Sequence, residues 1–272
     1  MPELPEVETI VRGLRRSVVG KTIASADVRL ARMVVAPQGV EFAREISGSR
    51  IVATRRRGKY AVIELDSGRS LVVGLRMTGR LVVATSREVP EYPRSHVVLH
   101  FVDGARLHFA DVRTFGRMRL VEPGEAWDRE LGVEPLSSGF TPEAFIGMLA
   151  ERTKSSKAFL LDQRRIAGIG NIYACEALWE ARIRPSRPAG ALTKAAACRL
   201  HDSIVNVLRR AITKRGTSVD DYVDAEGLEG GFQNHLAVYG RQGRLCPRCR
   251  TSRIVRTVVA QRGTWWCRRC QR

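Results

Sequence analysis

The chain has 272 residues and carries 46 Lys and Arg against 28 Asp and Glu, which gives a net charge of +18 and a pI of about 10.7. This length suffices for two domains with buried cores, and so large a positive charge argues against an enzyme of small neutral substrates. The charge predicts a polyanionic partner such as nucleic acid, and the lack of a long apolar run argues against a membrane protein.

A helix is the first element predicted along the chain. Pro5 suits a first helical turn, because a proline there loses no intrahelical hydrogen bond. Apolar side chains then repeat at helical spacing at Val7, Ile10 and Leu14 before Gly20 ends the pattern. The spacing predicts an amphipathic helix that packs against a core.

The residues in front of this helix have the chemistry of a nucleophile beside its acids. Removal of Met1 would leave the secondary amine of Pro2 at the terminus, with the carboxyl groups of Glu3 and Glu6 close behind it. An α-amino group is partly neutral at physiological pH, and attack by a secondary amine on an aldehyde-like carbon gives an iminium ion. The pattern alone leaves open whether the proline serves catalysis or only helps to start the helix.

Residues 21 to about 135 alternate between apolar and polar side chains as strands do. Runs at 61–65 and 71–75 flank an Asp-Ser-Gly turn, and runs at 97–102 and 106–109 flank an Asp-Gly turn. Such hairpins, joined by short polar turns, predict an antiparallel β-sandwich.

Lys59 is a candidate functional residue within this block, because it is one of only six lysines beside forty arginines. It lies in the basic segment RRRGKY, which leads into a predicted strand. Where a bare charge suffices, this chain uses arginine, so Lys59 is a candidate for giving or taking a proton. An ordinary phosphate contact is the alternative interpretation.

From Thr141 the pattern becomes helical. Helices are predicted at 142–152, 155–163, 171–182 and 193–214. The glycine-rich segment 166–172 separates the second helix from the third and lets the backbone approach a ligand, and Asn171 heads a helix whose free N–H groups attract phosphate. A tight packing turn between helices is the alternative.

The C-terminal segment carries two Cys-x-x-Cys pairs that are 17 residues apart, as in a zinc ribbon. Its four expected zinc ligands are Cys246, Cys249, Cys267 and Cys270. Two disulfides are the alternative, which a cytosolic location disfavours. From Gln233 to the end there are ten arginines and no acidic residue, and Arg262 followed by Gly263 is expected at the tip of a hairpin. This hairpin is predicted to contact phosphates.

Taken together, these segments resemble the bacterial formamidopyrimidine-DNA glycosylase family, of the helix–two-turn–helix glycosylases. The resemblance covers essentially the whole chain, and its motifs, in order, are MPELPEVET, RRGKY, LRMTGRL, ADVRTFG, LLDQRRIAGIGNIYACEAL, RGTSVDDYVDAEG, FQNHLAVYGRQG and the CPRC/CRRC pair. It implies an α+β multidomain fold: an N-terminal helix with an antiparallel β-sandwich over 1–135, a helix–two-turn–helix domain over 136–232 that includes a lesion-covering loop at 216–232, and a zinc ribbon over 233–272.

The resemblance also implies an activity. The chain is expected to be a bifunctional DNA glycosylase and abasic-site lyase of base excision repair, acting on duplex DNA with oxidised purines such as 8-oxoguanine and formamidopyrimidines, or with abasic sites. Pro2 would attack C1′ of a flipped-out nucleotide, and Glu3 would protonate the sugar ring oxygen. Lys59 matches the lysine of β-elimination, and Arg262 matches the arginine of δ-elimination.

The remaining site residues are carried over by the same resemblance. Met77, Arg113 and Phe115 would fill the void left by the flipped base. The expected DNA contacts are His96, Arg113, Arg152, Asn171 and Lys157. The expected lesion pocket comprises Glu6, Glu176, Thr217 and Ser218. One structural Zn²⁺, a monomeric state and a cytoplasmic, nucleoid-associated bacterial location complete the expectation.

The chain departs from the family pattern at Val112, Arg215, Gly231 and Arg250. None of these is a proposed catalytic residue or zinc ligand, so the departures bear on lesion preference and loop mobility. Two alternatives stay open: a relative of endonuclease VIII that prefers oxidised pyrimidines, and a noncatalytic zinc-ribbon protein that binds distorted DNA.

Overall fold

The computed structural model describes residues 2–37, 39–86, 91–218 and 222–272, and the chain falls into two compact units. The first unit comprises Met1–Asp128 and Lys214–Gln233, and the second comprises Arg129–Thr213 and Asn234–Arg272. The segment expected to cover the lesion thus packs with the first unit, although it follows the helical block in sequence. The division into three domains remains a prediction.

The first unit begins with helix α1 (Leu4–Val18), where the sequence predicts it. Pro5 lies in its first turn, and Arg15 and Arg16 in its last turn face the negative end of the helix dipole. The side chains of Val7 and Leu14 are fully buried on its apolar face. That face belongs to one hydrophobic core shared with strands of both sheets and with the segment around residue 222.

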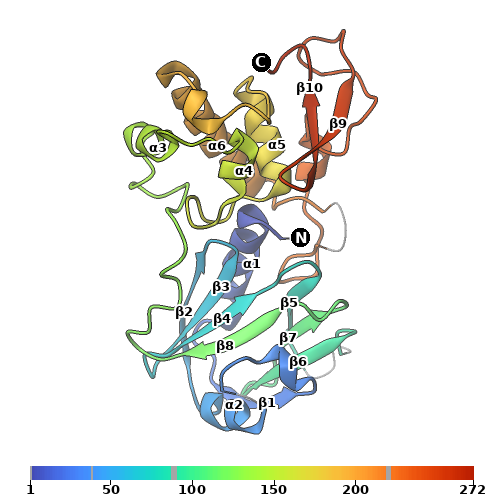
Figure 1. The fold of residues 1–272 in the computed structure, drawn as a ribbon. Helices are drawn as coiled ribbons and strands as arrows, with labels where there is room; N and C mark the ends of the chain where they lie inside the picture. Colours follow the sequence, from blue (N-terminus) through green and yellow to red (C-terminus); the bar gives the residue numbers. More distant parts are fainter. Residues whose placement is uncertain (1, 38, 87–90, 219–221) are drawn as a thin grey trace. The chain divides into compact units, whose positions relative to one another are not determined.

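Two four-stranded antiparallel sheets form the sandwich of the first unit in the described part of the chain (Figure 1). One sheet has the order β1-β6-β7-β5, and the other has the order β2-β3-β4-β8. The strands are β1 (Ile23–Val28), β2 (Ile51–Arg57), β3 (Tyr60–Leu65), β4 (Ser70–Gly74), β5 (Gly79–Ala84), β6 (Ser95–Phe101), β7 (Arg106–Asp111) and β8 (Arg117–Val121). A short 3-10 turn, η1 (Ala31–Met33), and helix α2 (Gly39–Ile46) join β1 to β2. The predicted sandwich is confirmed.

The second unit combines helices with a C-terminal hairpin. Its helices are α3 (Pro142–Leu149), α4 (Ser156–Leu161), α5 (Asn171–Glu180) and α6 (Lys194–Thr213), and a 3-10 turn, η2 (Ala189–Ala191), precedes α6. A second 3-10 turn, η3 (Phe232–His235), spans the point in the chain where the first unit ends and the second resumes. The hydroxyls of Thr141 and Ser155 cap α3 and α4 by accepting backbone N–H groups. Helix α3 ends earlier than predicted, because Ala150 leaves the helical region with a ψ of 134° and Glu151 has a positive φ of 57°.

The hairpin of the second unit pairs β9 (Ile254–Val259) with β10 (Arg262–Cys267). Ala260 and Gln261, both with positive φ, form the turn, so Arg262 is the first strand residue after it. No helix in the described part of the chain is long and apolar enough to cross a membrane.

The buried His108 of β7 makes a pH-dependent contribution to stability. Its side chain is fully buried, its Nδ1 lies 3.0 Å from Ser95 Oγ, and its Nε2 has no partner among the described residues. Burial lowers the pKa of His108 to about 4 from a usual value of 6.5. Between these values the unfolded chain binds more protons than the folded chain, so stability falls as the pH drops from 6.5 towards 4.

We expect this imidazole to remove at most about 3 kcal/mol from the free energy of unfolding over that range. Urea unfolding of the wild type and of His108→Gln at several pH values measures it. The wild type should lose more stability than the variant on acidification, and parallel pH curves would contradict the assignment.

Candidate active site and nucleic-acid interface

The N-terminal turn holds two acidic side chains directly behind Pro2. Glu3 and Glu6 form a capping box at the start of α1, and the backbone N–H of Glu3 donates to Glu6 Oε2 at 2.8 Å. Glu3 is 2% exposed and Glu6 is 1% exposed, and Pro2 is buried as well. Met1 lies outside the described residues. The turn therefore fixes a proline next to two carboxyl groups that are shielded from solvent.

The second oxygen of Glu6 holds the segment expected to cover the lesion. Its Oε1 accepts the backbone N–H of Thr217 at 2.7 Å. Gly216 has a φ of +78°, and a Cβ there would lie 2.8 Å from the same oxygen, so only glycine fits. Ser218 Oγ donates to the Tyr222 carbonyl at 2.8 Å. Thr217 and Ser218 thus form one base of the loop, whose residues 219–221 lie outside the described part.

Lys59 lies in the tight turn between β2 and β3, where Gly58 has a φ of +56°. The side chain of Arg56 holds this turn by a hydrogen bond to its backbone. Its side chain is 9% exposed, its Nη1 donates to the Gly58 carbonyl at 3.1 Å, and its Nε pairs with Glu8 of α1 at 3.1 Å. Arg56 therefore ties the turn that carries Lys59 to the helix that follows Pro2. Arg56 was visible in the sequence only as one member of a basic run.

The three predicted void-filling residues come together on the surface of the first unit. Arg113 Nη1 lies 3.3 Å from Met77 Sδ, and its guanidinium carbon lies 4.9 Å from the centroid of the Phe115 ring. Met77 is 37% exposed and Phe115 is 49% exposed. Apolar side chains of this size are costly to leave in water, so their joint exposure indicates a surface that receives a ligand.

Asp111 organises the loop that presents Arg113 and Phe115, and sequence reasoning missed it. Its buried carboxylate accepts the backbone N–H of Arg113 at 3.1 Å and that of Gly116 at 2.7 Å, and it also accepts the Thr78 hydroxyl. Its own carbonyl accepts Nε2 of His96 at 2.9 Å. The only sequence signal was an aspartate at the end of a strand before a turn.

In the second unit, two predicted DNA contacts converge on the β9–β10 hairpin. Lys157 Nζ and Asn171 Nδ2 both donate to the carbonyl oxygen of Gly263, at 2.9 and 3.1 Å. Lys157 is fully buried, whereas Arg262 is exposed. Arg152 is exposed just after α3. The structure thus brings Lys157 and Asn171 together beside Arg262, and Arg152 lies on a separate element of the same unit.

Glu176 on α5 is fully enclosed by the segment that leads to the hairpin. Its two carboxylate oxygens accept the backbone N–H groups of Ala237, Val238 and Tyr239 at 2.8 to 2.9 Å. Burial raises the pKa of Glu176, although these hydrogen bonds oppose the shift. The observed hydrogen bonds of Glu176 are therefore to the protein's own backbone, and they attach the segment 237–239 to α5.

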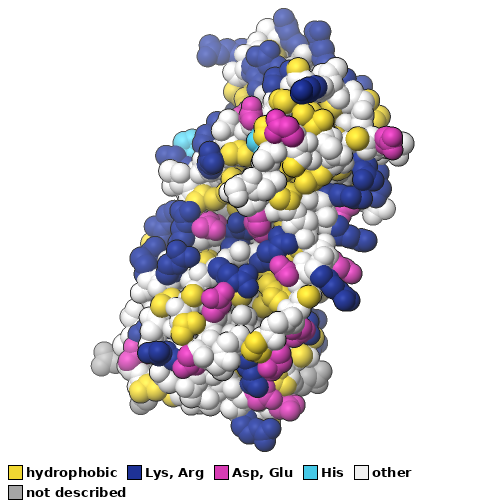
Figure 2. Space-filling model, turned by 90° about the vertical axis from the view of Figure 1, so that its left-hand side faces the viewer, with side chains coloured by type: hydrophobic (Ala, Val, Ile, Leu, Met, Phe, Trp, Pro, Cys, Tyr) yellow, Lys and Arg dark blue, Asp and Glu magenta, His cyan; other side chains and the backbone are white. Residues whose placement is uncertain are grey.

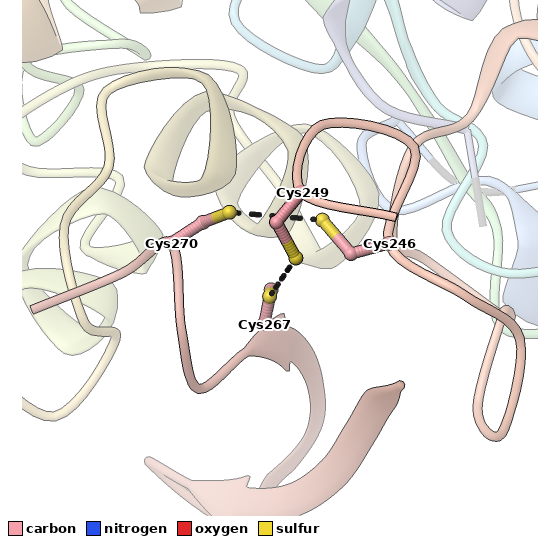
Figure 3. A group of neighbouring side chains, drawn as sticks. All are labelled: Cys246, Cys249, Cys267 and Cys270. Atoms are coloured by element: carbon pink, nitrogen blue, oxygen red, sulfur yellow. Dashed lines mark hydrogen bonds between the residues drawn. The ribbon is translucent and has the colours of Figure 1, made fainter. Parts of the chain in front are cut away.

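The four predicted zinc ligands cluster, as Figure 3 shows. Their Sγ atoms all lie within 4.8 Å of one another, and the pairs Cys246–Cys270 and Cys249–Cys267 are 3.8 Å apart. A disulfide requires an S–S distance of about 2 Å, so these pairs are not disulfides. A tetrahedron with Zn–S bonds of about 2.3 Å has edges of about 3.8 Å, which matches the observed spacing. The cluster fits one structural Zn²⁺ with no open coordination position.

The surroundings of the cluster suit bound metal. Backbone N–H groups of Thr251 and Ser252 lower the pKa of Cys249, whereas burial and the neighbouring thiols raise the pKa of Cys270. Trp179 Nε1 donates to Cys246 Sγ at 3.5 Å, and the Arg248 guanidinium stacks 4.1 Å from the Trp179 ring. The zinc site is therefore attached to the C-terminal end of α5.

Basic side chains are widespread on the surface. On the face in Figure 2, Lys and Arg side chains gather in several groups, with Asp and Glu side chains among them. With the net charge of +18, this distribution suits the phosphates of a nucleic acid.

Comparison with known families matches three consecutive parts of the chain. Residues 1–118 match the formamidopyrimidine-DNA glycosylase N-terminal domain, residues 131–222 match the formamidopyrimidine-DNA glycosylase H2TH domain, and residues 240–272 match a zinc finger found in FPG and IleRS. In chain order, the three matches correspond to the N-terminal helix with its sandwich, to the helical block and to the zinc ribbon predicted from the sequence.

Whole-length relatives are similar as well. The formamidopyrimidine-DNA glycosylase of Pelotomaculum thermopropionicum is 44% identical over 277 residues, which cover 100% of this chain and 99% of that protein. A complex between Lactococcus lactis Fpg and abasic-site DNA has a TM-score of 0.92 at 36% identity, covering 99% of both chains. A mutant of the same protein with Fapy-dG containing DNA has a TM-score of 0.92 at 37% identity, covering 100% of both chains.

Proposed function

Because the chain belongs to the formamidopyrimidine-DNA glycosylase family, we propose that it is a bifunctional DNA glycosylase and abasic-site lyase of base excision repair. Its proposed substrate is duplex DNA with an oxidised purine, namely 8-oxoguanine or a formamidopyrimidine, or with an abasic site. The observation that carries the proposal is the N-terminal turn, in which Pro2 directly precedes the buried carboxyl groups of Glu3 and Glu6. A noncatalytic binding protein has no need of the secondary amine that removal of Met1 would expose at Pro2, beside two buried acids.

In the proposed reaction, the nitrogen of Pro2 attacks C1′ of a nucleotide that has left the base stack. The bond from C1′ to the damaged base breaks, and the base leaves with a proton. Glu3 protonates the ring oxygen as the sugar opens, and the amine, having lost its proton, remains as an iminium ion. Loss of a C2′ proton then expels the 3′ phosphate with help from Lys59. Loss of the C4′ proton, assisted by Arg262, expels the 5′ phosphate. Water hydrolyses the iminium ion, which releases the unsaturated sugar remnant as an aldehyde and restores the Pro2 amine, so that the DNA is left with a one-nucleoside gap.

The exposed group of Met77, Arg113 and Phe115 supports the proposal that these side chains enter the duplex. Two apolar side chains would occupy the space of the departed base, and the guanidinium would hydrogen-bond the orphaned base opposite. The loop that carries two of them is held by the buried Asp111 carboxylate, so little reorganisation is needed on binding. His96, Arg152 and Asn171 are proposed contacts to the DNA backbone.

The proposed lesion pocket combines Glu6 with the loop base at Thr217 and Ser218. The observed contact of Glu6 with the Thr217 N–H supports a role in positioning that loop. For Glu176, the observed contacts support attachment of the hairpin segment to α5, which is the role we propose. We further propose three domains over 1–135, 136–232 and 233–272, a monomer, and a cytoplasmic, nucleoid-associated location.

Borohydride trapping tests the proposed function. The protein is incubated with duplexes carrying 8-oxoguanine opposite cytosine, an oxidised pyrimidine, a bare abasic site or no lesion, and each adduct is mapped by mass spectrometry. We expect a covalent adduct on a peptide that begins at Pro2 with 8-oxoguanine and abasic DNA, and none with undamaged DNA. Trapping with the oxidised pyrimidine but not with 8-oxoguanine would favour the endonuclease VIII-like alternative. Lack of any adduct would favour a noncatalytic binding protein.

A further inference from the structure

We propose that Lys157 is a positioning residue for Arg262: its buried ammonium group fixes the backbone of the β10 strand from which Arg262 projects. This inference rests on the proposed function, in which Arg262 assists the second elimination. It replaces the expectation that Lys157 contacts a DNA phosphate directly. Its effect on DNA cleavage would therefore be exerted entirely through the hairpin.

The burial of Lys157 favours a contact within the protein. The side chain lies on α4 and is 0% exposed, in a chain where most basic side chains reach solvent. Complete burial of a lysine is rare and costly, because the ammonium group loses its hydration. Its Nζ compensates by donating hydrogen bonds to the Gly263 carbonyl at 2.9 Å and to Thr264 Oγ1 at 2.6 Å. Both acceptors belong to the two residues that follow Arg262.

A chain of hydrogen bonds leads from Lys157 to Arg262 itself. Thr264 Oγ1 accepts from Lys157 and donates to the Arg262 carbonyl at 2.9 Å. Thr264 is fully buried, so its hydroxyl has a fixed environment. The two contacts of Lys157 therefore orient the peptide groups on both sides of Gly263. Because the direction of the Arg262 side chain follows from its backbone, Lys157 sets where the guanidinium is presented.

Asn171 acts on the same carbonyl and extends the arrangement to the start of α5. Its Nδ2 donates one hydrogen to Gly263 O at 3.1 Å, and a primary amide carries a second hydrogen on the same nitrogen. If that hydrogen contacts a DNA phosphate, one amide joins the phosphate to the hairpin. Lys157 would then fix the position of Arg262 relative to Asn171, two residues from different elements that are both proposed to act on the DNA.

Lys157→Met tests the proposal, because methionine has a similar length and no donor. On a duplex with an abasic site, under single-turnover conditions, we expect the ratio of δ- to β-elimination product to fall roughly tenfold, in the direction of Arg262→Ala, since a small misplacement of a reacting group is costly. Lys154→Met removes an exposed lysine three residues earlier and should leave the ratio unchanged. Zinc content and the melting temperature are measured for each variant.

The double variant separates positioning from direct contact. If Lys157 acts through Arg262, Lys157→Met together with Arg262→Ala should be no worse than Arg262→Ala alone. Additive losses, or an unchanged product ratio in folded Lys157→Met, would overturn the proposal. Thr264→Val breaks the hydrogen-bond chain while keeping the side-chain shape, and it should reproduce the shifted product ratio. This variant replaces Lys157→Met if the latter does not fold. A normal product ratio in Thr264→Val would also overturn the proposal. If the wild type fails to cleave abasic DNA, the proposed function fails instead.

Discussion

A Pro2→Gly protein is expected to lose at least about 100-fold of its rate of cleavage of abasic DNA and to give little borohydride-trapped adduct. Glycine keeps an amine, but a primary one on a flexible terminus, whereas proline supplies a secondary amine that forms an iminium ion without a further proton. Loss of a positioned reacting group of this kind costs about two to four orders of magnitude. Trapping yield and single-turnover cleavage of the same duplex measure both effects.

The control for this variant is Pro123→Gly, which removes an exposed proline elsewhere in the first unit. It should trap DNA as the wild type does. Mass spectrometry of each protein must show the terminus, because a retained Met1 turns the Pro2 nitrogen into an amide and gives the same loss for another reason. Cleavage by Pro2→Gly at the wild-type rate would remove Pro2 from the mechanism.

Loss of zinc is expected to have the second large effect. Cys246→Ala leaves three thiols, and structural zinc sites in small zinc-finger peptides contribute about 10–16 kcal/mol of folding free energy. The ribbon packs around a small apolar cluster that includes Cys246 and Ile254 and that is shared with Cys175 of α5. Without the metal, Arg262 and the other arginines of the ribbon lose their fixed positions, and we expect affinity for lesion duplex to fall at least about 100-fold.

Fluorescence anisotropy at several salt concentrations measures this loss, with zinc quantified in the same samples. Cys198→Ala removes a thiol on α6, outside the cluster, and should bind both zinc and DNA normally. Since Pro2 belongs to the other unit, trapping by Cys246→Ala should recover in part at high DNA concentration. Wild-type affinity in a zinc-free variant would contradict the role given to the ribbon.

The features predicted best from sequence are those that depend on neighbouring residues. The spacing of Val7, Ile10 and Leu14 specifies α1, and two Cys-x-x-Cys pairs specify the cluster, because each pattern is complete within a short segment. The turns at Gly68 and Gly104 similarly indicate hairpins.

Features that depend on distant partners were not predictable from the pattern. As single apolar residues, Met77 and Phe115 would be assigned to a core; the family resemblance alone implied their exposure, and the fold shows it. Lys157 has the composition of a phosphate contact, but its acceptors are 106 and 107 residues away in sequence. For Asp111, an aspartate before a turn was too weak a signal, because its role arises from backbone N–H groups that the loop turns towards it.

The first unit is made from two stretches of chain, and this has a consequence for its synthesis. Glu6 binds Thr217, and Gly13 packs against Ala225, so α1 acquires part of its surroundings only after the entire helical block has been made. Glu6 and Thr217 are 211 residues apart, and at about 5–20 residues per second this stretch takes roughly 10–40 s to translate. The ribosome therefore makes Pro2, the proposed nucleophile, first and the segment that packs against its turn much later, so that the N-terminal turn reaches its final form only after residues 217–225 have been made.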